Sequence, residues 1–351
     1  MAKIPVAVLA ATGAVGQRFV QLLADHPWFE VVAVTGSART AGERYGDNVH
    51  WVLSDPMPAA IADLVVQPTT PNLDVPVVFS ALPTAEAREL EPQFAAAGYA
   101  VITNASAYRM AEDVPLLIPE LNPEHTALVP RQQEKCGWPG FIVASPNCST
   151  TSAVLPLHIF QEAFGLEAAL ITTLQAISGA GYPGVSGLDI LGNVIPHIPG
   201  EDEKLEAEPK KLLGRMENGA LVLADIPISA EATRVPVRDG HLATVSVRLG
   251  RRVAPGEAID VLRSWQPPAI AASLPSSPER VLVYQPEPDR PQPRLDRASE
   301  KGLAWTVGNV RACPVLDLRY MALTHNTLRG AASGSILNAE LLVEQGYIPR
   351  G

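Results

Sequence analysis

The sequence predicts an α/β fold in two parts, an open parallel sheet with helices on both faces and then an α+β part with a largely antiparallel sheet. The first 35 residues run as strand, turn, helix and strand, which is one βαβ unit. Short apolar runs continue as far as residue 144, with helical stretches between some of them, as in a doubly wound sheet. Beyond residue 148 apolar and polar residues alternate over longer runs, which is typical of antiparallel strands.

The N-terminal part supplies the parallel strands. The apolar run at residues 4–9 indicates a buried strand, a turn of small residues follows at 10–16, and residues 18–24 have helical spacing. We expect the next strand at residues 29–35 and a later helix at residues 85–97. The remaining strands of this sheet are expected at residues 77–81, 100–103, 116–118 and 141–144.

The C-terminal part begins after Cys148. We expect a helix at residues 152–164 and an extended loop or sheet edge in the Pro-rich segment 266–293. Residues 329–345 are rich in small residues and then helical, so a last helix can return to the first part. The runs that predict the second sheet, with helices on one face, lie at residues 168–177, 221–226, 241–248 and 303–310. The domain boundaries expected from these patterns are 1–148, 149–324 and 325–351.

The composition restricts the class of protein. A chain of 351 residues can hold two domains, and 47% hydrophobic with 18% charged residues describes a globular protein. The formal net charge of −10 argues against a general nucleic-acid binder. Three cysteines without a CxxC pair make no disulfide framework, which fits a reducing cytoplasm. Because no apolar run is long enough for a signal peptide or a membrane span, we expect no membrane association.

A turn of small residues connects the first strand to the first helix. Backbone N–H groups in such a turn can approach a pyrophosphate at the helix N-terminus. The spacing resembles a glycine-rich dinucleotide loop, except that Ala10 stands in place of the first glycine. A tight connection without a ligand is the alternative, but strand, turn and helix in this order favour a Rossmann-type dinucleotide-binding domain. The residues expected to contact the dinucleotide here are Thr12, Gly13, Ala14 and Val15.

The end of the second strand discriminates between NAD and NADP. Proteins that bind NAD usually present an acidic residue there to the ribose 2′-hydroxyl. No acid occurs at this point, and Ser37, Arg39 and Thr40 offer hydroxyl groups and a guanidinium that can pair with phosphate oxygens. A solvated loop arginine is the simpler interpretation in isolation, but at this position the sequence favours NADP.

Cys148 is the candidate nucleophile. It follows an apolar strand and precedes a Ser-Thr-Thr-Ser run that opens a helix, and a helix N-terminus favours the thiolate. A lone cysteine is more often a small buried hydrophobe, but polar, turn-forming neighbours and a dinucleotide loop in the same chain favour the nucleophile. His241, at the start of a strand, is the candidate proton acceptor. No His, Cys, Asp or Glu cluster has metal-ligand spacing, so we expect no metal.

A series of short segments along nearly the whole chain matches one family. They are, in order, residues 12–16, 79–83, 104–110, 145–148, 175–181, 192–196, 200–204, 234–241 and 325–332. In these segments the chain resembles the aspartate-semialdehyde dehydrogenases, in the branch common to archaea and fungi. An ordered set of this kind is highly specific for the superfamily and less specific for the substrate. The chain departs from the family pattern at His197, where Tyr is frequent, and at Ser333, where Gly is usual.

The resemblance implies a cysteine-dependent active site. Cys148 would attack the acyl carbon and form a thioester, and His241 would act as general acid and base. Gln175 would orient the substrate at the thioester. Arg234 would hold the substrate carboxylate as a bidentate clamp, and Glu201 would bind the substrate amine.

The resemblance also implies subsites for phosphate and for the cofactor. Lys204, Arg109 and Asn147 would hold the phosphate. From the residues alone, Lys204 equally fits a solvated helix face and Arg109 a turn cap, so these roles depend on the resemblance. The further residues implied to lie at the NADP site are Ser80, Leu82, Ser178, Gly179 and Asn326.

The implied reaction is the NADPH-dependent reductive dephosphorylation of L-aspartyl 4-phosphate to L-aspartate 4-semialdehyde, which feeds lysine, threonine and methionine synthesis. The implied partners are small molecules, aspartyl phosphate and phosphate, and a second copy of the chain in a homodimer or homotetramer. Two alternatives stay open. A malonyl-CoA reductase would share the scaffold, although the Glu201 and Lys204 pair favours an amino-acid phosphate. A non-catalytic NADP-binding regulator would lack the nucleophile or the base, and both are present here.

Overall fold

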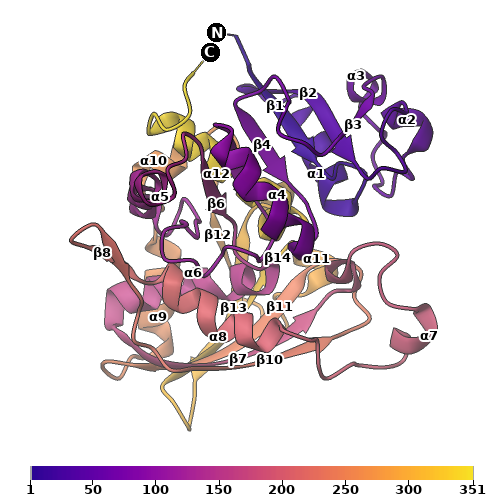
Figure 1. Cartoon of the computed structure of the whole chain (residues 1–351). Coiled ribbons are helices and arrows are strands. Elements are labelled where there is room, and N and C mark those ends of the chain that lie inside the picture. The colour runs from indigo at the N-terminus through magenta and orange to yellow at the C-terminus, as the bar shows by residue number, and fades with distance from the viewer. Residues whose placement is uncertain (1, 351) are drawn as a thin grey trace.

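The computed structural model describes residues 2–350 and contains two six-stranded sheets. The first sheet lies in the upper half of Figure 1, and the second lies in the lower half. The two ends of the described part of the chain lie close together at the top of the view. Among the described residues, no helix is long and apolar enough to cross a membrane.

The first sheet is wholly parallel, with the strand order β3-β2-β1-β4-β5-β6. This order confirms the predicted Rossmann-type sheet. The order reverses between β1 and β4, and open α/β sheets bind their ligands at such a switch point. The strands are β1 (Ile4–Leu9), β2 (Phe29–Gly36), β3 (Val66–Pro68), β4 (Val77–Ser80), β5 (Ala100–Thr103) and β6 (Phe141–Ala144).

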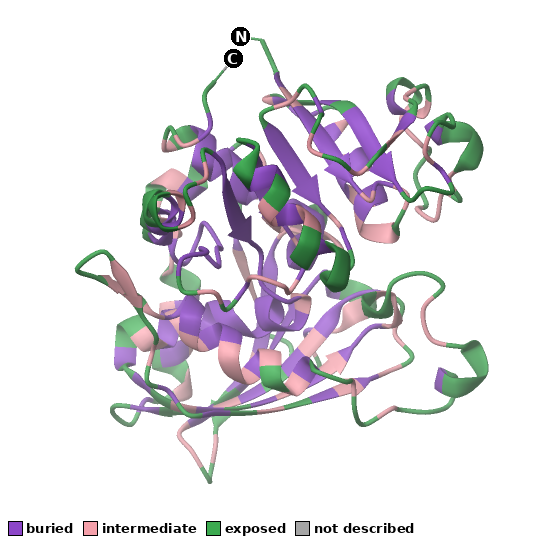
Figure 2. Ribbon diagram, in the orientation of Figure 1, coloured by how far each residue is buried: buried purple, intermediate pink, exposed green. Residues whose placement is uncertain are grey.

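Alternate side chains of β1 enter two separate cores, because successive strand residues point to opposite faces. On one face Val8 belongs to the same buried cluster as Phe19 of α1 and Leu337 of α12. On the other face Leu9 shares a cluster with Phe94 of α4. Figure 2 shows the strands of this sheet buried beneath their helices. The helices concerned are α1 (Ala14–Leu23), α4 (Thr84–Ala96), α5 (Leu128–Cys136) and α12 (Ser333–Glu344).

The second sheet has the strand order β10-β7-β11-β14-β13-β12. Its three inner pairs are antiparallel and its two outer pairs are parallel, which confirms a largely antiparallel sheet. Helices α6 (Cys148–Phe164) and α8 (Glu201–Leu212) lie between the two sheets, above β7 and β10 in Figure 1. The strands are β7 (Leu166–Gln175), β10 (Ile228–Arg234), β11 (His241–Leu249), β12 (Leu282–Gln285), β13 (Trp305–Ala312) and β14 (Leu318–Thr324).

Two of the expected strands need correction, and other strands were not predicted. The run 116–118 forms a single bridge from Leu116 to Ala144 rather than a strand. The run 221–226 contributes only β9 (Ala220–Val222), which pairs with β8 (Arg215–Glu217) in a separate hairpin. The strand that enters the sheet is β10, whose polar sequence ISAEATR hid it. Strands β3 and β14 were also not predicted, the first because it is very short.

The C-terminal segment packs against the first sheet. Asn338 of α12 donates hydrogen bonds to the carbonyl oxygen of Leu117 at 3.1 Å and to Ser145 Oγ at 3.0 Å. The Pro-rich segment contains the edge strand β12, in agreement with the expected sheet edge. The remaining elements are α2 (Tyr45–Asn48), α3 (Ala59–Ala62), α7 (Gly187–Ile190), α9 (Pro255–Ser264), α10 (Ala269–Ala272) and α11 (Pro293–Asp296), with single helical turns at Pro123–Ala127, Ile177–Ala180, Ser299–Gly302 and Leu328–Ala332.

Candidate active site

Cys148 is the first residue of α6, directly beyond the carboxyl end of β6. Asn147 caps the helix, because its side chain accepts a hydrogen bond from the backbone N–H of Ser149 at 2.8 Å. Gly330 lies against the cysteine so closely that a Cβ there would stand 2.8 Å from Cys148 Cβ. The C-terminal segment therefore forms one wall of the nucleophile's position.

His241 faces Cys148 from the start of β11, in the other sheet. Its Nε2 lies 3.2 Å from Cys148 Sγ, and the ring is fully buried. The backbone N–H of Ala176 donates to His241 Nδ1 at 3.0 Å. A nitrogen that accepts a hydrogen bond carries no proton, so the neutral ring holds its proton on Nε2, the atom that faces the sulfur. His241 is therefore arranged as a hydrogen-bond donor toward Cys148.

Burial disfavours the charged form of both groups. Burial raises the pKa of the Cys148 thiol to about 12, the charge of Glu201 adds to this, and Arg109 and Arg234 oppose it. Burial together with the nearby Arg234 charge lowers the pKa of His241 to about 3. Burial of the thiol therefore opposes the lowering of its pKa that the helix N-terminus leads us to expect.

Arg234 ends β10 beside this pair. Its guanidinium is buried and donates from one terminal nitrogen to the carbonyl oxygen of Ala176 at 2.7 Å. A Cβ on Gly179 would stand 2.9 Å from both Arg234 Nη1 and His241 Cε1, so only glycine fits here. The turn after β7 therefore holds the arginine and the histidine together, and the arginine keeps donors that can bind a carboxylate.

Glu201 is the centre of a polar cluster on the other side of Cys148. Its Oε1 accepts from Lys204 Nζ at 2.8 Å and from Asn147 Nδ2 at 3.0 Å. Its Oε2 accepts from Gln175 Nε2 at 3.1 Å and from Ser149 Oγ at 3.3 Å. Burial raises the pKa of Glu201, but the Lys204 and Gln175 contacts outweigh it and hold the pKa below its usual value. The carboxylate is therefore ionised and already fully hydrogen-bonded.

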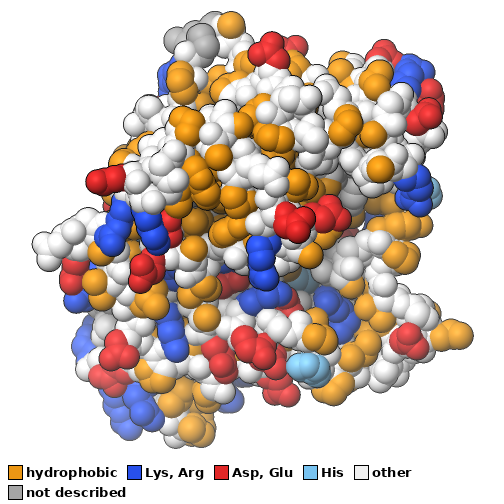
Figure 3. All heavy atoms as spheres, viewed as in Figure 1, with side chains coloured by type: hydrophobic (Ala, Val, Ile, Leu, Met, Phe, Trp, Pro, Cys, Tyr) orange, Lys and Arg blue, Asp and Glu red, His pale blue; other side chains and the backbone are white. Residues whose placement is uncertain are grey.

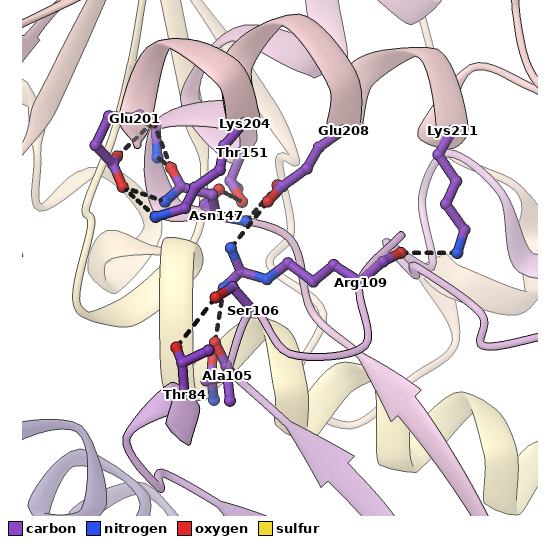
Figure 4. A network of polar contacts seen from close by, with 12 residues as sticks. Thr84, Ala105, Ser106, Arg109, Asn147, Thr151, Glu201, Lys204, Glu208 and Lys211 are labelled. Atoms are coloured by element: carbon purple, nitrogen blue, oxygen red, sulfur yellow. Dashed lines mark hydrogen bonds and ion pairs between the residues drawn. The ribbon is translucent and has the colours of Figure 1, made fainter. Parts of the chain in front are cut away.

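Arg109 reaches the same cluster from the turn beyond β5. It donates to Glu208 Oε1 at 2.9 Å and to the carbonyl oxygen of Asn104 at 2.6 Å. Figure 4 shows Arg109 directed toward α8, near Asn147. Basic and acidic side chains lie close together where the upper and lower halves of the molecule meet, as Figure 3 shows for one face. Basic side chains are therefore gathered at this site, although the formal net charge of the chain is −10.

The dinucleotide turn lies beyond β1, at the switch point of the first sheet. Ala10 adopts a φ of 54°, the left-handed conformation that the missing glycine would adopt without strain. No side chain caps α1 at Gly13, so its first-turn N–H groups are available to an anion. Ser37 and Arg39 are exposed at the end of β2, whereas the Thr40 hydroxyl donates to the Ser37 carbonyl at 3.2 Å.

A cleft of about 430 Å³ lies between the start of α1 and the turn after β7, and its lining includes Ala14, Arg18, Ser178 and Thr327. At this cleft Asn326 donates to Ser178 Oγ at 2.8 Å and accepts from the backbone N–H of Gly240 at 2.8 Å. The structure therefore brings together Ser178 and Asn326, two of the residues that the resemblance implies at the NADP site.

The side chains of Ser80 and Leu82, which were expected at the NADP site, point into the protein. The Ser80 hydroxyl donates to Glu91 at 2.7 Å, so it points into the protein rather than toward a ligand. The Leu82 side chain is buried in the core. Any contact of these two residues with a dinucleotide would therefore come mainly from their backbone, at the carboxyl end of β4.

Comparison with known proteins agrees with this arrangement. A family model described as "Semialdehyde dehydrogenase, NAD binding domain" matches residues 5–129, and one described as "Semialdehyde dehydrogenase, dimerisation domain" matches residues 156–329. An aspartate-semialdehyde dehydrogenase of Archaeoglobus fulgidus is 49% identical over 98% of this chain and 99% of its own length. The chain belongs to the aspartate-semialdehyde dehydrogenase family.

Further members of the family match over equal lengths. The aspartate-semialdehyde dehydrogenase of Cryptococcus neoformans is 45% identical over 99% of this chain and 98% of its own. A crystal structure of the enzyme from Candida albicans with NADP has a TM-score of 0.90 at 41% identity, covering 99% of this chain and all of that one. These matches confirm both the resemblance to the archaeal and fungal members and the α/β fold class.

Several residues of the family site escaped the sequence analysis. Glu208, Ser149 and the backbone N–H of Ala176 all contact an expected site residue. One feature of the sequence could have indicated Glu208 and Lys211. They repeat the helical spacing of Glu201 and Lys204 along α8. The backbone N–H of Ala176 had none, because its contact with the histidine depends on the pairing of β7 with β11.

The described part of the chain contains no group of three or more His, Cys, Asp or Glu side chains placed to hold a metal ion. The polar atoms around Cys148 instead come from arginine, lysine and amide side chains, which bind anions.

Proposed function

We propose that this chain catalyses the NADPH-dependent reductive dephosphorylation of L-aspartyl 4-phosphate to L-aspartate 4-semialdehyde. The observation that supports it most directly is the contact between Cys148 Sγ and His241 Nε2 at 3.2 Å. Arg234 lies on one side of this pair, and the cluster of Glu201, Lys204 and Arg109 lies on the other. An amino acid that carries a phosphate has a carboxylate for Arg234, and it has an amine and a phosphate for the cluster on the other side.

The acid's two ends are held by opposite walls of the site. Arg234 binds the α-carboxylate with the donors that Ala176 leaves free. The substrate amine binds Glu201 Oε1 in place of Lys204 Nζ, and the released ammonium turns to the phosphate with Arg109 and Asn147. Lys204 can move because its side chain is about one-third exposed, unlike the buried Glu201.

Acylation joins the acyl carbon to Cys148 Sγ. The sulfur attacks the acyl carbon, the bond from that carbon to the phosphate oxygen breaks, and the thiol proton leaves on the departing phosphate. An acyl phosphate is activated, so this step needs no metal ion. Gln175 lies between Glu201 and Thr173 and orients the thioester carbonyl.

Reduction then acts on the thioester. The reduced nicotinamide, when bound, supplies a hydride to the thioester carbonyl carbon. The Nε2–H of His241 donates a hydrogen bond to the oxygen that becomes negative, as preorganised donors do in other acyl-transfer sites. The carbon–sulfur bond then breaks, the aldehyde leaves, and Sγ takes up a proton from solvent.

NADP is the cofactor that the chain's residues fit. The uncapped N-terminus of α1 can receive the pyrophosphate, and the exposed Arg39 beside Ser37 can receive a 2′-phosphate. The Candida albicans relative was crystallised with NADP. Because the three cysteines are all free, we also infer a reducing, cytoplasmic location.

The test is a spectrophotometric assay in the reverse direction. Purified protein with L-aspartate 4-semialdehyde, phosphate and NADP⁺ is expected to form NADPH, and Cys148→Ala is expected to form none. Cys136→Ala is the matched control and should retain the wild-type rate, since Cys136 ends α5, where its thiol contacts Asp113. A correctly folded wild-type protein that forms no NADPH would refute the proposal.

The same preparation also tests malonyl-CoA reductase. NADPH oxidation on malonyl-CoA without turnover of the semialdehyde would select that reaction instead. The ionised Glu201 opposes it, because this carboxylate would face a substrate that has no amine.

We further propose that two copies pair through the free face of the second sheet. α6 and α8 cover one face of this sheet, whereas Leu170, which is 48% exposed, and Thr244 point from the other face. Apolar and hydroxyl side chains on that face suit a second copy of the same chain. Leu170→Asp is expected to shift the sedimentation equilibrium toward monomer, whereas Leu295→Asp, at an equally exposed leucine of α11, is not.

A further inference from the structure

Helix α8 presents four ionisable side chains to the nucleophile's surroundings. Glu201, Lys204, Glu208 and Lys211 follow one another at helical spacing, so they form one stripe. Figure 4 shows all four extending from α8 toward Asn147 and Arg109. The proposed function uses Glu201 and Lys204, and leaves Glu208 and Lys211 without a role.

Glu208 connects two elements that the proposed function assigns to the phosphate. Its Oε1 accepts from Arg109 Nη1 at 2.9 Å, and its Oε2 accepts from the backbone N–H of Asn147 at 2.7 Å. The carboxylate is only 2% exposed. One buried group therefore fixes both the guanidinium and the residue directly before Cys148.

Arg109 is held in a single orientation but keeps unused donors. Glu208 and the carbonyl oxygen of Asn104 each take one of its terminal nitrogens. Its Nε is buried and has no hydrogen-bond partner in the described part of the chain. A buried unpaired donor is costly, so the guanidinium is arranged for an acceptor that a ligand brings.

Lys211 fixes the turn that carries this arginine. Its Nζ donates to the carbonyl oxygens of Arg109 at 2.7 Å, Ala111 at 2.6 Å and Val114 at 2.7 Å. An ammonium has three donors, so all of them are used within one turn. Burial lowers the pKa of Lys211 to about 8, yet the side chain remains the common centre of that turn.

We infer that Glu208 and Lys211 are positioning residues that build the phosphate subsite, by fixing Arg109 relative to Asn147 and thereby to Cys148. The inference rests on the proposed function, which assigns the phosphate to Arg109, Asn147 and Lys204. Charge and geometry make opposite predictions here. As a charge alone, Glu208 repels phosphate, whereas as a positioning group it holds the phosphate's ligands in place.

The experiment measures the phosphate concentration at half-maximal NADPH formation in Glu208→Gln. If Glu208 positions Arg109, the loss of a charge-assisted hydrogen bond should raise this concentration about tenfold or more. The KM for the semialdehyde should stay within about twofold, since Arg234 and Glu201 are untouched. The matched control is Glu203→Gln, which removes the same charge from an exposed position of α8.

A second measurement does not depend on turnover. Inorganic phosphate should protect Cys148 of the wild type and of Glu203→Gln from iodoacetamide, and the half-protecting concentration should rise to the same extent in Glu208→Gln. Glu208→Asp serves if the glutamine variant does not fold, because the shorter carboxylate cannot reach both partners. Combining Glu208→Gln with Arg109→Lys should give less than the product of the two single effects.

A phosphate requirement that falls or is unchanged in Glu208→Gln would overturn the inference, since the carboxylate would then act as a charge alone. Equal rises in the KM for phosphate and for the semialdehyde would also overturn it, because they indicate general disorder of the site. If the wild type forms no NADPH but phosphate protects Cys148, the proposed reaction fails and the subsite stands. If phosphate protects neither wild type nor control, the subsite itself is refuted.

Discussion

The backbone N–H of Ala176 and the Nδ1 atom of His241 are joined by a hydrogen bond of 3.0 Å, and this contact decides which nitrogen of the His241 ring carries the proton. We expect ¹⁵N NMR of histidine-labelled protein to show His241 as the neutral, Nε2-protonated form between about pH 5 and pH 8. His197, whose side chain is 65% exposed, supplies a reference signal from a solvent-exposed ring. A His241 signal protonated at Nδ1 would contradict this assignment.

The alkylation rate of Cys148 should rise steadily with pH. Its pKa is raised to about 12 by burial, while that of His241 is lowered to about 3, so neither group titrates near neutrality. Below its pKa the thiolate fraction grows about tenfold per pH unit, and the iodoacetamide rate should follow it between about pH 6 and pH 9. Mass spectrometry of the labelled peptide measures this rate. A plateau below pH 8 would show that the ligand-free site already holds a thiolate.

Gly179 should not tolerate a side chain. A Cβ there would stand 2.9 Å from Arg234 Nη1 and from His241 Cε1, so Gly179→Ala must displace one of them. Because displacing a catalytic group by about 1 Å can cost on the order of 10²-fold, we expect kcat to fall by at least about tenfold. Gly187→Ala is the control, since its Cβ would meet nothing nearer than 4.0 Å. Thermal unfolding should be similar in the two variants, and equal kcat values would contradict the prediction.

Arg39 should control the choice between NADP and NAD. We expect Arg39→Ala to raise the KM for NADP⁺ about tenfold, because the arginine can make a charge-assisted contact with the 2′-phosphate. The KM for NAD⁺, which lacks this phosphate, should change little. The control is Arg44→Ala on the same exposed surface, where the arginine pairs with Asp47 and Asp63. An equal rise in the KM for NADP⁺ and in the KM for NAD⁺ would contradict the prediction, because it would indicate that the loop as a whole has lost its structure.

Glu91 should make stability depend on pH. This fully buried carboxyl accepts hydrogen bonds from Ser80 and Thr103, and burial raises its pKa from 4.5 to about 7. Between these two values the folded state binds the proton more tightly than the unfolded state, so stability falls as pH rises from about 4.5 to about 7. Above that range the cost approaches about 3 kcal/mol, at roughly 1.4 kcal/mol per pKa unit.

Glu91→Gln, which stays uncharged, should lose this dependence. Urea unfolding measures the free energy of unfolding of the variant and of the wild type. The variant minus wild-type difference should be more positive at about pH 8 than at about pH 5. Glu89→Gln, at an exposed position of the same helix, should show no such shift. The same difference at both pH values would mean that Glu91 does not titrate in this range.

The sequence by itself determined the elements that depend on local pattern. The βαβ unit, the acid-free end of β2, a helix start near Cys148 and the α/β class all follow from runs of neighbouring residues, and the ordered motifs indicated the family. Strands with polar sequences, such as β10, were missed because periodicity cannot identify a strand whose burial comes from pairing.

The tertiary structure decided what depends on contacts between distant residues. Cys148 and His241 meet only because α6 packs on the sheet that contains β11, and Ala176 orients the ring only because β7 pairs with β11. Burial then raised the pKa of the thiol that the local sequence alone predicted to be lowered. Glu208 joined Arg109 to Asn147 from a third element. The dielectric surroundings and orientation of each group come from residues far away in the chain, so they are fixed only when the chain folds.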